Sequence, residues 1–243
     1  RAWADNYLLL LVNTGTDKAM KKAAVDTLLD RQVDGIIYAT MWHRQVNPPQ
    51  NIREVPTVLL DCYVADRSLP SVVPDEVRGG YEATKYLLEQ GHRRIGYIGD
   101  RSGVPAGIMR VEGYKKALAE FAVPADPTLL RYEANSDPHD GYLGALQLMK
   151  LPNRPSALFC FTDRMAMGAY KAIRHLNLSI PQDVAIVGFD NQDLIAADLD
   201  PGLTTMALPH LEMGSWAVNH LLTLINEQAM MQHLVQHKLH CPL

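Results

Sequence analysis

The chain has 243 residues, a length that suits two lobes of ordinary size, and it is 47% hydrophobic and 21% charged, as globular proteins are. Its net charge is -4, so the chain as a whole does not present a basic surface to which nucleic acid could bind. No apolar run is long enough to span a bilayer. Residues 1–5 lack the apolar segment of a signal peptide, although a mature exported protein would have lost it.

Strand-like and helix-like segments alternate along the whole chain. In the first part we expect strands at 8–12, 33–38, 55–61 and 72–73, and helices at 17–30 and 76–90, the latter ended by Gly91. The cycle then continues with strands at 94–98, 128–132, 157–161 and 184–189, and helices at 110–121, 140–150 and 164–176. A strand at 203–208, a helix at 210–225 and an edge strand at 233–240 follow. This alternation predicts βαβ units, and hence an α/β fold with parallel sheets.

The beginning of the chain looks incomplete for such a fold. A doubly wound lobe normally opens with a strand and a helix, but only residues 1–7 precede the first expected strand. We therefore expect a first strand and helix to be missing from this sequence.

Polar residues follow several of the expected strands. Asp61, Thr162 with Asp163, and Asp190 with Asn191 each end a strand, and Arg110 opens the helix after the loop 100–109. Ligands of open α/β sheets bind beyond the carboxyl ends of the strands. Carboxylates accept hydrogen bonds from sugar hydroxyls and a guanidinium donates to them, so this set suits sugar recognition.

Ordinary structural roles compete with this interpretation at every position. Thr162 and Asp163 are typical helix caps, Asp190 and Asn191 suit a turn after a strand, and Arg110 has Glu112 or Glu82 as surface partners. Aromatic residues also flank the strand ends, and these either stack on a sugar or pack in the core: Phe161, Phe189, Trp42 and Tyr63.

Signals of an enzyme, a metal site or a cofactor are poor. The glycines at 96–107 do not form a phosphate-binding fingerprint, and no Gly-x-Ser-x-Gly elbow is present. Three of the nine histidines, His233, His237 and His240, lie close together in sequence, but on a segment expected to be a strand. Three cysteines without metal-type spacing, Cys62, Cys160 and Cys241, suit free thiols and favour the cytoplasm over the periplasm. We expect no catalysis, no metal and no cofactor.

Five motifs in order give the chain a resemblance to the lactose-repressor (LacI/GalR) family of bacterial transcription regulators. They span most of the chain and read Gly91-His92-Arg93-Arg94-Ile95-Gly96, Arg110-Val111-Glu112-Gly113-Tyr114, Asp163-Arg164-Met165-Ala166-Met167-Gly168-Ala169, Ile180-Pro181-Gln182-Asp183 leading to Gly188-Phe189-Asp190-Asn191, and Pro201-Gly202-Leu203-Thr204-Thr205.

The resemblance implies two Rossmann-like lobes with parallel sheets, joined by a hinge that the chain crosses three times, as in the periplasmic binding protein-like fold. It implies an N-terminal lobe of residues 1–73 and 208–235 and a C-terminal lobe of 74–207 and 236–243, with an effector cleft between them. The family's DNA-binding helix-turn-helix headpiece is absent from these residues, so operator DNA would be bound by a domain outside this sequence.

The resemblance also implies residue roles. Asp61, Arg110 and Asp190 match the family's polar effector contacts, and Thr162, Asp163, Phe161 and Trp42 complete the expected ligand-binding set. Sugar-responsive members often have Asn where this chain has Thr162. Ser136 stands where purine-responsive members have a stacking aromatic, which argues against a nucleobase.

The sequence therefore predicts the effector-binding and dimerisation core of a repressor that binds a small sugar or sugar derivative. The expected homodimer interface includes helix 76–90 and segment 192–199, with Leu194 and Ile195 exposed. The main alternative is the periplasmic sugar-binding protein of an ABC transporter, which would be monomeric. A sugar-converting enzyme is a third possibility that lacks a positioned acid–base pair.

Overall fold

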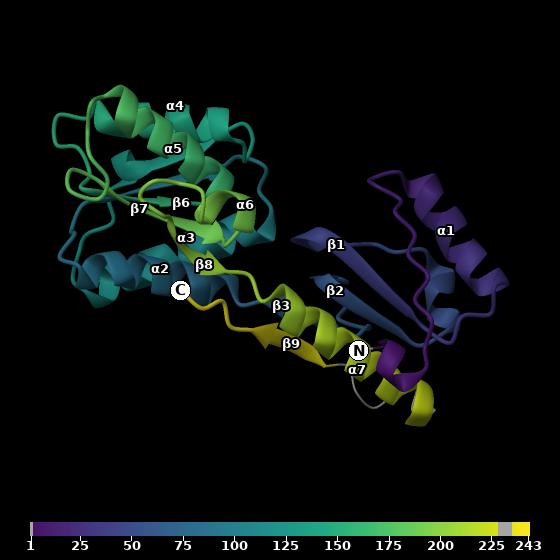
Figure 1. The fold of residues 1–243 in the computed structure, drawn as a ribbon. Helices are drawn as coiled ribbons and strands as arrows, with labels where there is room; N and C mark the ends of the chain where they lie inside the picture. Colours follow the sequence, from purple (N-terminus) through teal and green to yellow (C-terminus); the bar gives the residue numbers. More distant parts are fainter. Residues whose placement is uncertain (1, 228–234) are drawn as a thin grey trace. The chain divides into compact units, whose positions relative to one another are not determined.

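The computed structural model describes residues 2–227 and 235–243, and the chain divides into two compact units (Figure 1). The first comprises Arg1–Pro74 and Pro209–Leu239, and the second Asp75–Leu208 and His240–Leu243. The chain therefore passes between the units after residues 74, 208 and 239. The last passage lies four residues later than expected, because strand β9 (Gln236–Leu239) pairs with β3 (Ser71–Pro74) in the sheet of the first unit.

The first unit is built around a parallel sheet in the order β1-β2-β3-β9. Its longer strands are β1 (Ile36–Gln45) and β2 (Thr57–Tyr63). Helix α7 (His210–Glu227) packs on one face, where Met213 and Leu221 meet Val58. Two helices pack on Ile36 on the opposite face of the sheet: helix α1 (Lys18–Asp30) and the 3-10 helix η2 (Gln50–Glu54). Asp17 caps the N-terminus of α1. Strand β9 lies at the edge of this sheet, as expected, while His233 lies outside the described residues.

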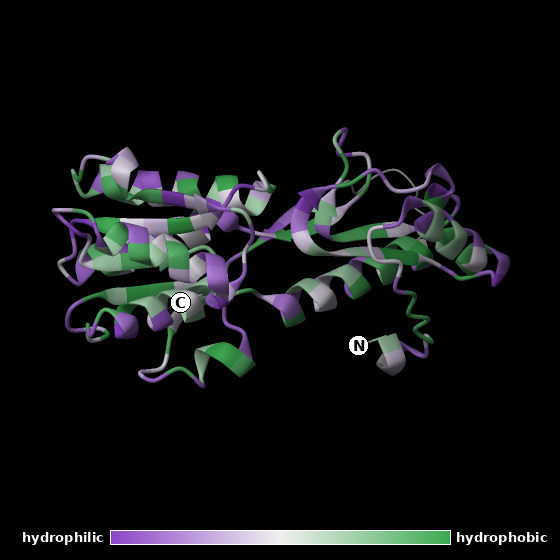
Figure 2. Ribbon diagram, turned by 90° about the horizontal axis from the view of Figure 1, so that it is seen from above, coloured by the Kyte–Doolittle hydropathy of each residue, from purple (hydrophilic) through white to green (hydrophobic). Residues whose placement is uncertain are grey.

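The second unit holds a five-stranded parallel sheet in the order β5-β4-β6-β7-β8. Helices α2 and α3 cover one face and α4 and α5 the other (Figure 1). In Figure 2 the strands of this unit are mainly in the colours of hydrophobic residues, whereas its helices show hydrophobic and hydrophilic residues. Each helix is mixed because only its apolar side faces the core. The elements are α2 (Glu76–Glu89), β4 (Ile95–Asp100), α3 (Pro105–Glu120), η3 (Pro127–Leu129), β5 (Leu130–Glu133), α4 (Pro138–Met149), β6 (Ala157–Cys160), α5 (Asp163–His175), β7 (Ala185–Asp190), α6 (Asp193–Ala196) and β8 (Thr204–Ala207).

Glycines let paired helices of the second unit touch backbone to backbone. A Cβ atom on Gly80 of α2 would lie 2.2 Å from the carbonyl oxygen of Arg110 in α3, and one on Gly113 would lie 2.1 Å from that of Val77. Helices α4 and α5 meet in the same way through Gly141 and Gly168. These contacts fix the spacing of each helix pair and so fix the positions of the side chains they carry.

Three expected elements differ in the structure. Residues 8–12 form no strand: they follow the 3-10 helix η1 (Ala2–Asp5) as exposed apolar coil. Among the strands that the structure describes, β1 is an end strand of its sheet and pairs with β2. Helix α3 begins at Pro105 and not at residue 110. The fixed φ angle of proline suits the first position of a helix. Strand β1 continues to Gln45 through a mixed run of polar and apolar residues, since its end pairs with Cys62 and Tyr63 of β2.

Within the described part of the chain, every helix is too short or too polar to cross a membrane. Cys62, Cys160 and Cys241 are free thiols, all buried. Burial raises the pKa of each thiol, that of Cys62 and that of Cys241 to about 12, so they pack as small neutral side chains.

Candidate functional site

Arg110 is a buried cation of the second unit, beside the ends of β6 and β7. Helix α3 places it in its second turn, and only 3% of the residue is exposed. Its Nε donates to Oε2 of Glu76 across 2.6 Å, and its Nη1 donates to the carbonyl oxygen of Phe161 across 2.5 Å. The guanidinium carbon lies 3.5 Å from the ring centre of Phe189 and 4.7 Å from that of Phe161. The guanidinium is therefore held against two aromatic rings and cannot reorient freely.

Asp190 ends strand β7 beside this guanidinium. Its Oδ1 lies 3.7 Å from Nη1 of Arg110, and its Oδ2 accepts a 3.0 Å hydrogen bond from Gln192. Its φ of 117° is a backbone conformation that side-chain-bearing residues rarely adopt, and such strain concentrates at functional sites. Burial raises the pKa of Asp190 to about 7, against the opposing effect of Arg110. Near neutral pH this carboxyl is thus only partly ionised.

The buried cluster contains more carboxyl groups than cationic side chains. One guanidinium, that of Arg110, lies among the carboxyl groups of Glu76, Asp163 and Asp190, which are 2%, 0% and 7% exposed. Burial also raises the pKa of Asp163. Buried carboxylates are stable only when donors satisfy their oxygen atoms, so a ligand that brings hydroxyl groups suits this cluster.

Asp163 and Thr162 are used within the protein. Asp163 accepts from the Thr205 hydroxyl at 2.5 Å and from the backbone N–H of Gln192 at 2.7 Å, so each carboxylate oxygen has a partner. Gly188 makes room for it, because a Cβ there would lie 2.4 Å from Oδ1 of Asp163. The Thr162 hydroxyl accepts from Met165 N at 3.2 Å and caps α5. Both residues therefore hold the ends of β6 and β7 in place around Asp190.

The other two expected ligand residues, Asp61 and Trp42, belong to the first unit. Asp61 lies in β2 with a φ of 57°, is 9% exposed, and its carbonyl oxygen accepts from the Thr40 hydroxyl at 2.9 Å. Trp42 lies where the pairing of β1 with β2 shifts register, and 37% of it is exposed. Tyr63 lies at the end of β2, and the Arg67 guanidinium carbon stacks over its ring, 3.8 Å from the ring centre. The ligand roles of Asp61 and Trp42 stay predictions.

The structure thus brings together Arg110, Phe161, Thr162, Asp163 and Asp190 in one unit. The surface partners proposed for Arg110 are wrong: Glu112 pairs with Lys116, and Glu82 with Arg78 and His240. Sequence reasoning missed Glu76, Gln192 and Thr205. The sequence did hold a signal that α2 and α3 touch near Arg110. Glycines, which allow close helix contact, stand next to each other at Gly79 and Gly80 and again at Gly113, three residues after Arg110.

Two further expectations concern α6 and Ser136. In the short helix α6, Leu194 is 87% exposed, as expected, but Ile195 is half-buried and not exposed. Ser136 is half-buried, and its hydroxyl donates to the Asp100 carboxylate. Among the residues that the structure describes, no three potential metal ligands gather in one place.

Comparison with known proteins gives consistent matches over most of the chain. A family model described as a periplasmic binding protein-like domain matches residues 84–240. The ribose operon repressor of Haemophilus influenzae is 34% identical over 90% of this chain, which spans 65% of that protein. A LacI-family transcriptional regulator from Rhizobium etli has a solved structure that is 31% identical, with a TM-score of 0.89 over 100% of this chain and 87% of that chain. A LacI-family regulator from Enterococcus faecium, solved with bound ribose, is 27% identical, with a TM-score of 0.77 over 98% of this chain and 86% of that chain.

Proposed function

Because the chain belongs to the LacI family of transcriptional regulators, with the family's periplasmic binding protein-like fold, we propose that it is the effector-binding and dimerisation core of a bacterial repressor. Its effector is a small sugar or sugar derivative, held at the carboxyl ends of β6 and β7. Operator DNA is bound by a part of the whole protein outside this sequence, since the chain spans 65% of the ribose operon repressor. The chain acts by binding and not by catalysis, and it works in the cytoplasm, where its three buried thiols would stay reduced.

The observation that carries this proposal is the geometry around Arg110. Its Nε and Nη1 are held by Glu76 and the Phe161 carbonyl, and Asp190 stands 3.7 Å away. A sugar hydroxyl accepts from a guanidinium and donates to a carboxylate at the same time, so vicinal hydroxyls fit beside both groups. The rings of Phe161 and Phe189 hold the guanidinium in place for this role.

A sugar fits better than a purine or pyrimidine base. A flat base needs an aromatic surface on which to stack, and Ser136 offers a hydroxyl that is already bonded to Asp100. The ribose bound to the Enterococcus faecium regulator makes ribose the first sugar to test.

Isothermal titration calorimetry with ribose, other aldoses, their phosphates and a purine base tests the ligand. We expect one sugar to bind at micromolar to millimolar Kd, and Asp190→Ala to abolish that binding because ligand hydroxyls lose their partner. The matched control is Asp193→Ala, which removes an exposed carboxylate three residues along the chain. Unchanged affinity in the Asp190 variant, or binding of the purine alone, would contradict the proposal.

Oligomeric state separates the regulator from a transport protein. A regulator core is expected to be a dimer in light scattering, and a periplasmic sugar-binding protein a monomer. A monomer that binds sugar would therefore favour the transport function, and the sugar site itself would stand.

A further inference from the structure

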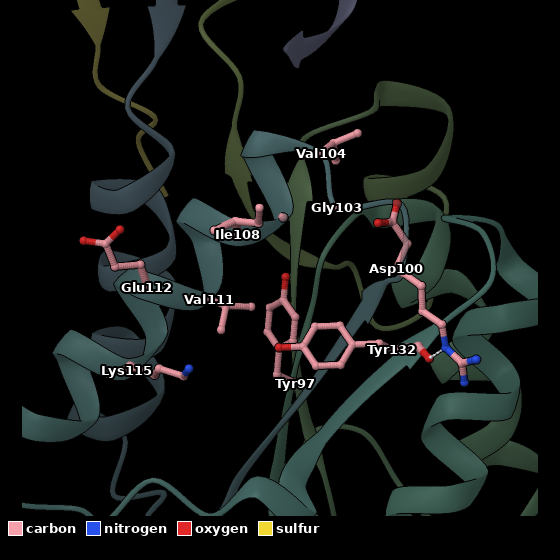
Figure 3. Close-up of a pocket in the computed structure, with 11 residues that line it drawn as sticks. Tyr97, Asp100, Gly103, Val104, Ile108, Val111, Glu112, Lys115 and Tyr132 are labelled. Atoms are coloured by element: carbon pink, nitrogen blue, oxygen red, sulfur yellow. Dashed lines mark hydrogen bonds between the residues drawn. The ribbon is translucent and has the colours of Figure 1, made fainter. Parts of the chain in front are cut away.

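A cavity opens in the second unit, on the side of α3 that faces strand β5. It has a volume of about 760 Å³ and lies between α3, the end of β4 and the ring of Tyr132 (Figure 3). Val104, Ile108 and Val111 form its apolar wall. Arg110 is not among its lining residues, so the cavity is separate from the sugar site proposed above. Its volume lies in the range of small-molecule sites.

The most informative residue of this cavity is Tyr97, because of its buried hydroxyl. Tyr97 lines the cavity and is fully buried, yet its hydroxyl makes no hydrogen bond to any residue that the structure describes. In Figure 3 its ring stands beside Val111, with the hydroxyl directed toward the end of the cavity at Ile108. The neighbouring Tyr114, just as buried, donates to the carbonyl of Ile95 at 2.8 Å. A buried polar group without a partner is destabilising, and a ligand oxygen would satisfy it.

The charges of the cavity indicate a neutral ligand. Asp100 and Glu112 at its rim are balanced by Arg101 and Lys115, so the rim favours neither an anion nor a cation. Burial raises the pKa of Tyr97, which therefore remains a neutral phenol that can donate one hydrogen bond.

The aromatic lining indicates the shape of the ligand. The Tyr97 ring lies 6.2 Å from that of Tyr132, in a tilted arrangement that a further ring can extend. A free sugar, with many hydroxyls, would leave most of them unpaired against these walls.

We propose that this cavity binds an uncharged aromatic molecule that carries one hydroxyl or carbonyl oxygen, hydrogen-bonded to Tyr97. The ligand packs its ring between Tyr132 and the apolar side of α3. The site is independent of the sugar proposal, because it rests on different side chains.

Fluorine NMR titration with para-fluorophenol, and with para-fluorotoluene of the same shape, tests the proposal on the whole chain. We expect the phenol to bind saturably and about fivefold or more tighter than the toluene, as one neutral hydrogen bond would give. In Tyr97→Phe the two probes should bind alike. Ile108→Trp, which fills the cavity from an exposed position, should abolish binding of both, and Leu211→Trp, at an exposed leucine of α7, should bind as the wild type does.

Several results would overturn the site. These are the absence of saturable phenol binding to the wild type, a phenol preference that persists in Tyr97→Phe, and unchanged binding in Ile108→Trp. Should Tyr97→Phe fail to fold, the Ile108→Trp result decides alone.

Discussion

Oδ1 of Asp190 lies 3.7 Å from Nη1 of Arg110, which is close enough for charge attraction and too far for a hydrogen bond. The same guanidinium is bonded to Glu76 at 2.6 Å. Arg110 is therefore positioned by one carboxylate and only attracted by the other. This difference separates a structural partner, Glu76, from the proposed ligand contact, Asp190.

Glu76→Gln should destabilise the fold. The substitution keeps the shape of the side chain and removes the carboxylate that binds Arg110, leaving a buried guanidinium poorly compensated. Breaking such a pair costs about 3 kcal/mol, which urea unfolding would detect. Lys116→Gln breaks the exposed pair with Glu112 and should change the free energy of unfolding by less than about 0.5 kcal/mol. Equal effects in the two variants would contradict the structural role of Glu76.

Stability should fall as pH rises through the range set by Asp190. Its pKa is raised from 3.8 to about 7 in the folded chain, so between these values the native state binds more protons than the unfolded state. The free energy of unfolding then decreases with rising pH, by up to about 1.4 kcal/mol per pH unit for this group. Asp190→Asn removes the contribution. Urea unfolding across the acidic to neutral range should show a flatter dependence in the variant, and parallel curves would disprove the assignment.

Gly113→Ala should disrupt the pairing of α2 and α3. The new methyl group would lie 2.1 Å from the Val77 carbonyl oxygen, and the two backbones would have to separate at a cost of about 3 kcal/mol or more. Gly214→Ala in α7 is the matched control, because nothing lies within 4 Å of its Cβ position and alanine favours a helix interior by up to about 1 kcal/mol. Thermal unfolding should move in opposite directions for the two variants, and a shift in the same direction would argue against the close contact.

Leu194→Glu should weaken the proposed dimer. The side chain is 87% exposed on α6, and a carboxylate buried in an apolar interface lacks a partner. Sedimentation at several protein concentrations should show a larger monomer fraction than in the wild type. Leu211→Glu, 78% exposed on α7, is the control and should leave the association unchanged. If Leu194→Glu associates as tightly as the wild type, α6 is not part of the interface.

The local pattern of apolar and polar residues predicted the fold class and most of the helices and strands. Buried parallel strands appear as continuous apolar runs, and amphipathic helices as apolar residues repeated at helical spacing. The pattern was wrong at residues 8–12, since an apolar run becomes a strand only beside a partner strand, and in the described part of the chain these residues do not pair with β1. It also missed that β1 runs on to Gln45, because pairing with Tyr63 and not apolar content extends the strand.

The candidate site was accessible from sequence only in part. Asp190 and Phe161 stand at strand ends, where the topology itself identifies them. The partner of Arg110 could not be identified in this way, because Glu76 is 34 residues away and on another helix. Tyr97 lies within an apolar strand, and only the packing of its neighbours shows that its hydroxyl has no hydrogen-bond partner among the described residues.

The cluster around Arg110 is tied directly to the segments by which the chain leaves and enters the second unit. Glu76 follows the passage after Pro74 by two residues, and the backbone N–H of Leu208, the last residue before another passage, donates to the carbonyl of Asp190. Gly80 and Gly113 make α2 and α3 one stiff pair behind Glu76. A ligand bound to Arg110 and Asp190, as proposed above, would therefore contact a cluster that is joined directly to two of the segments connecting the units.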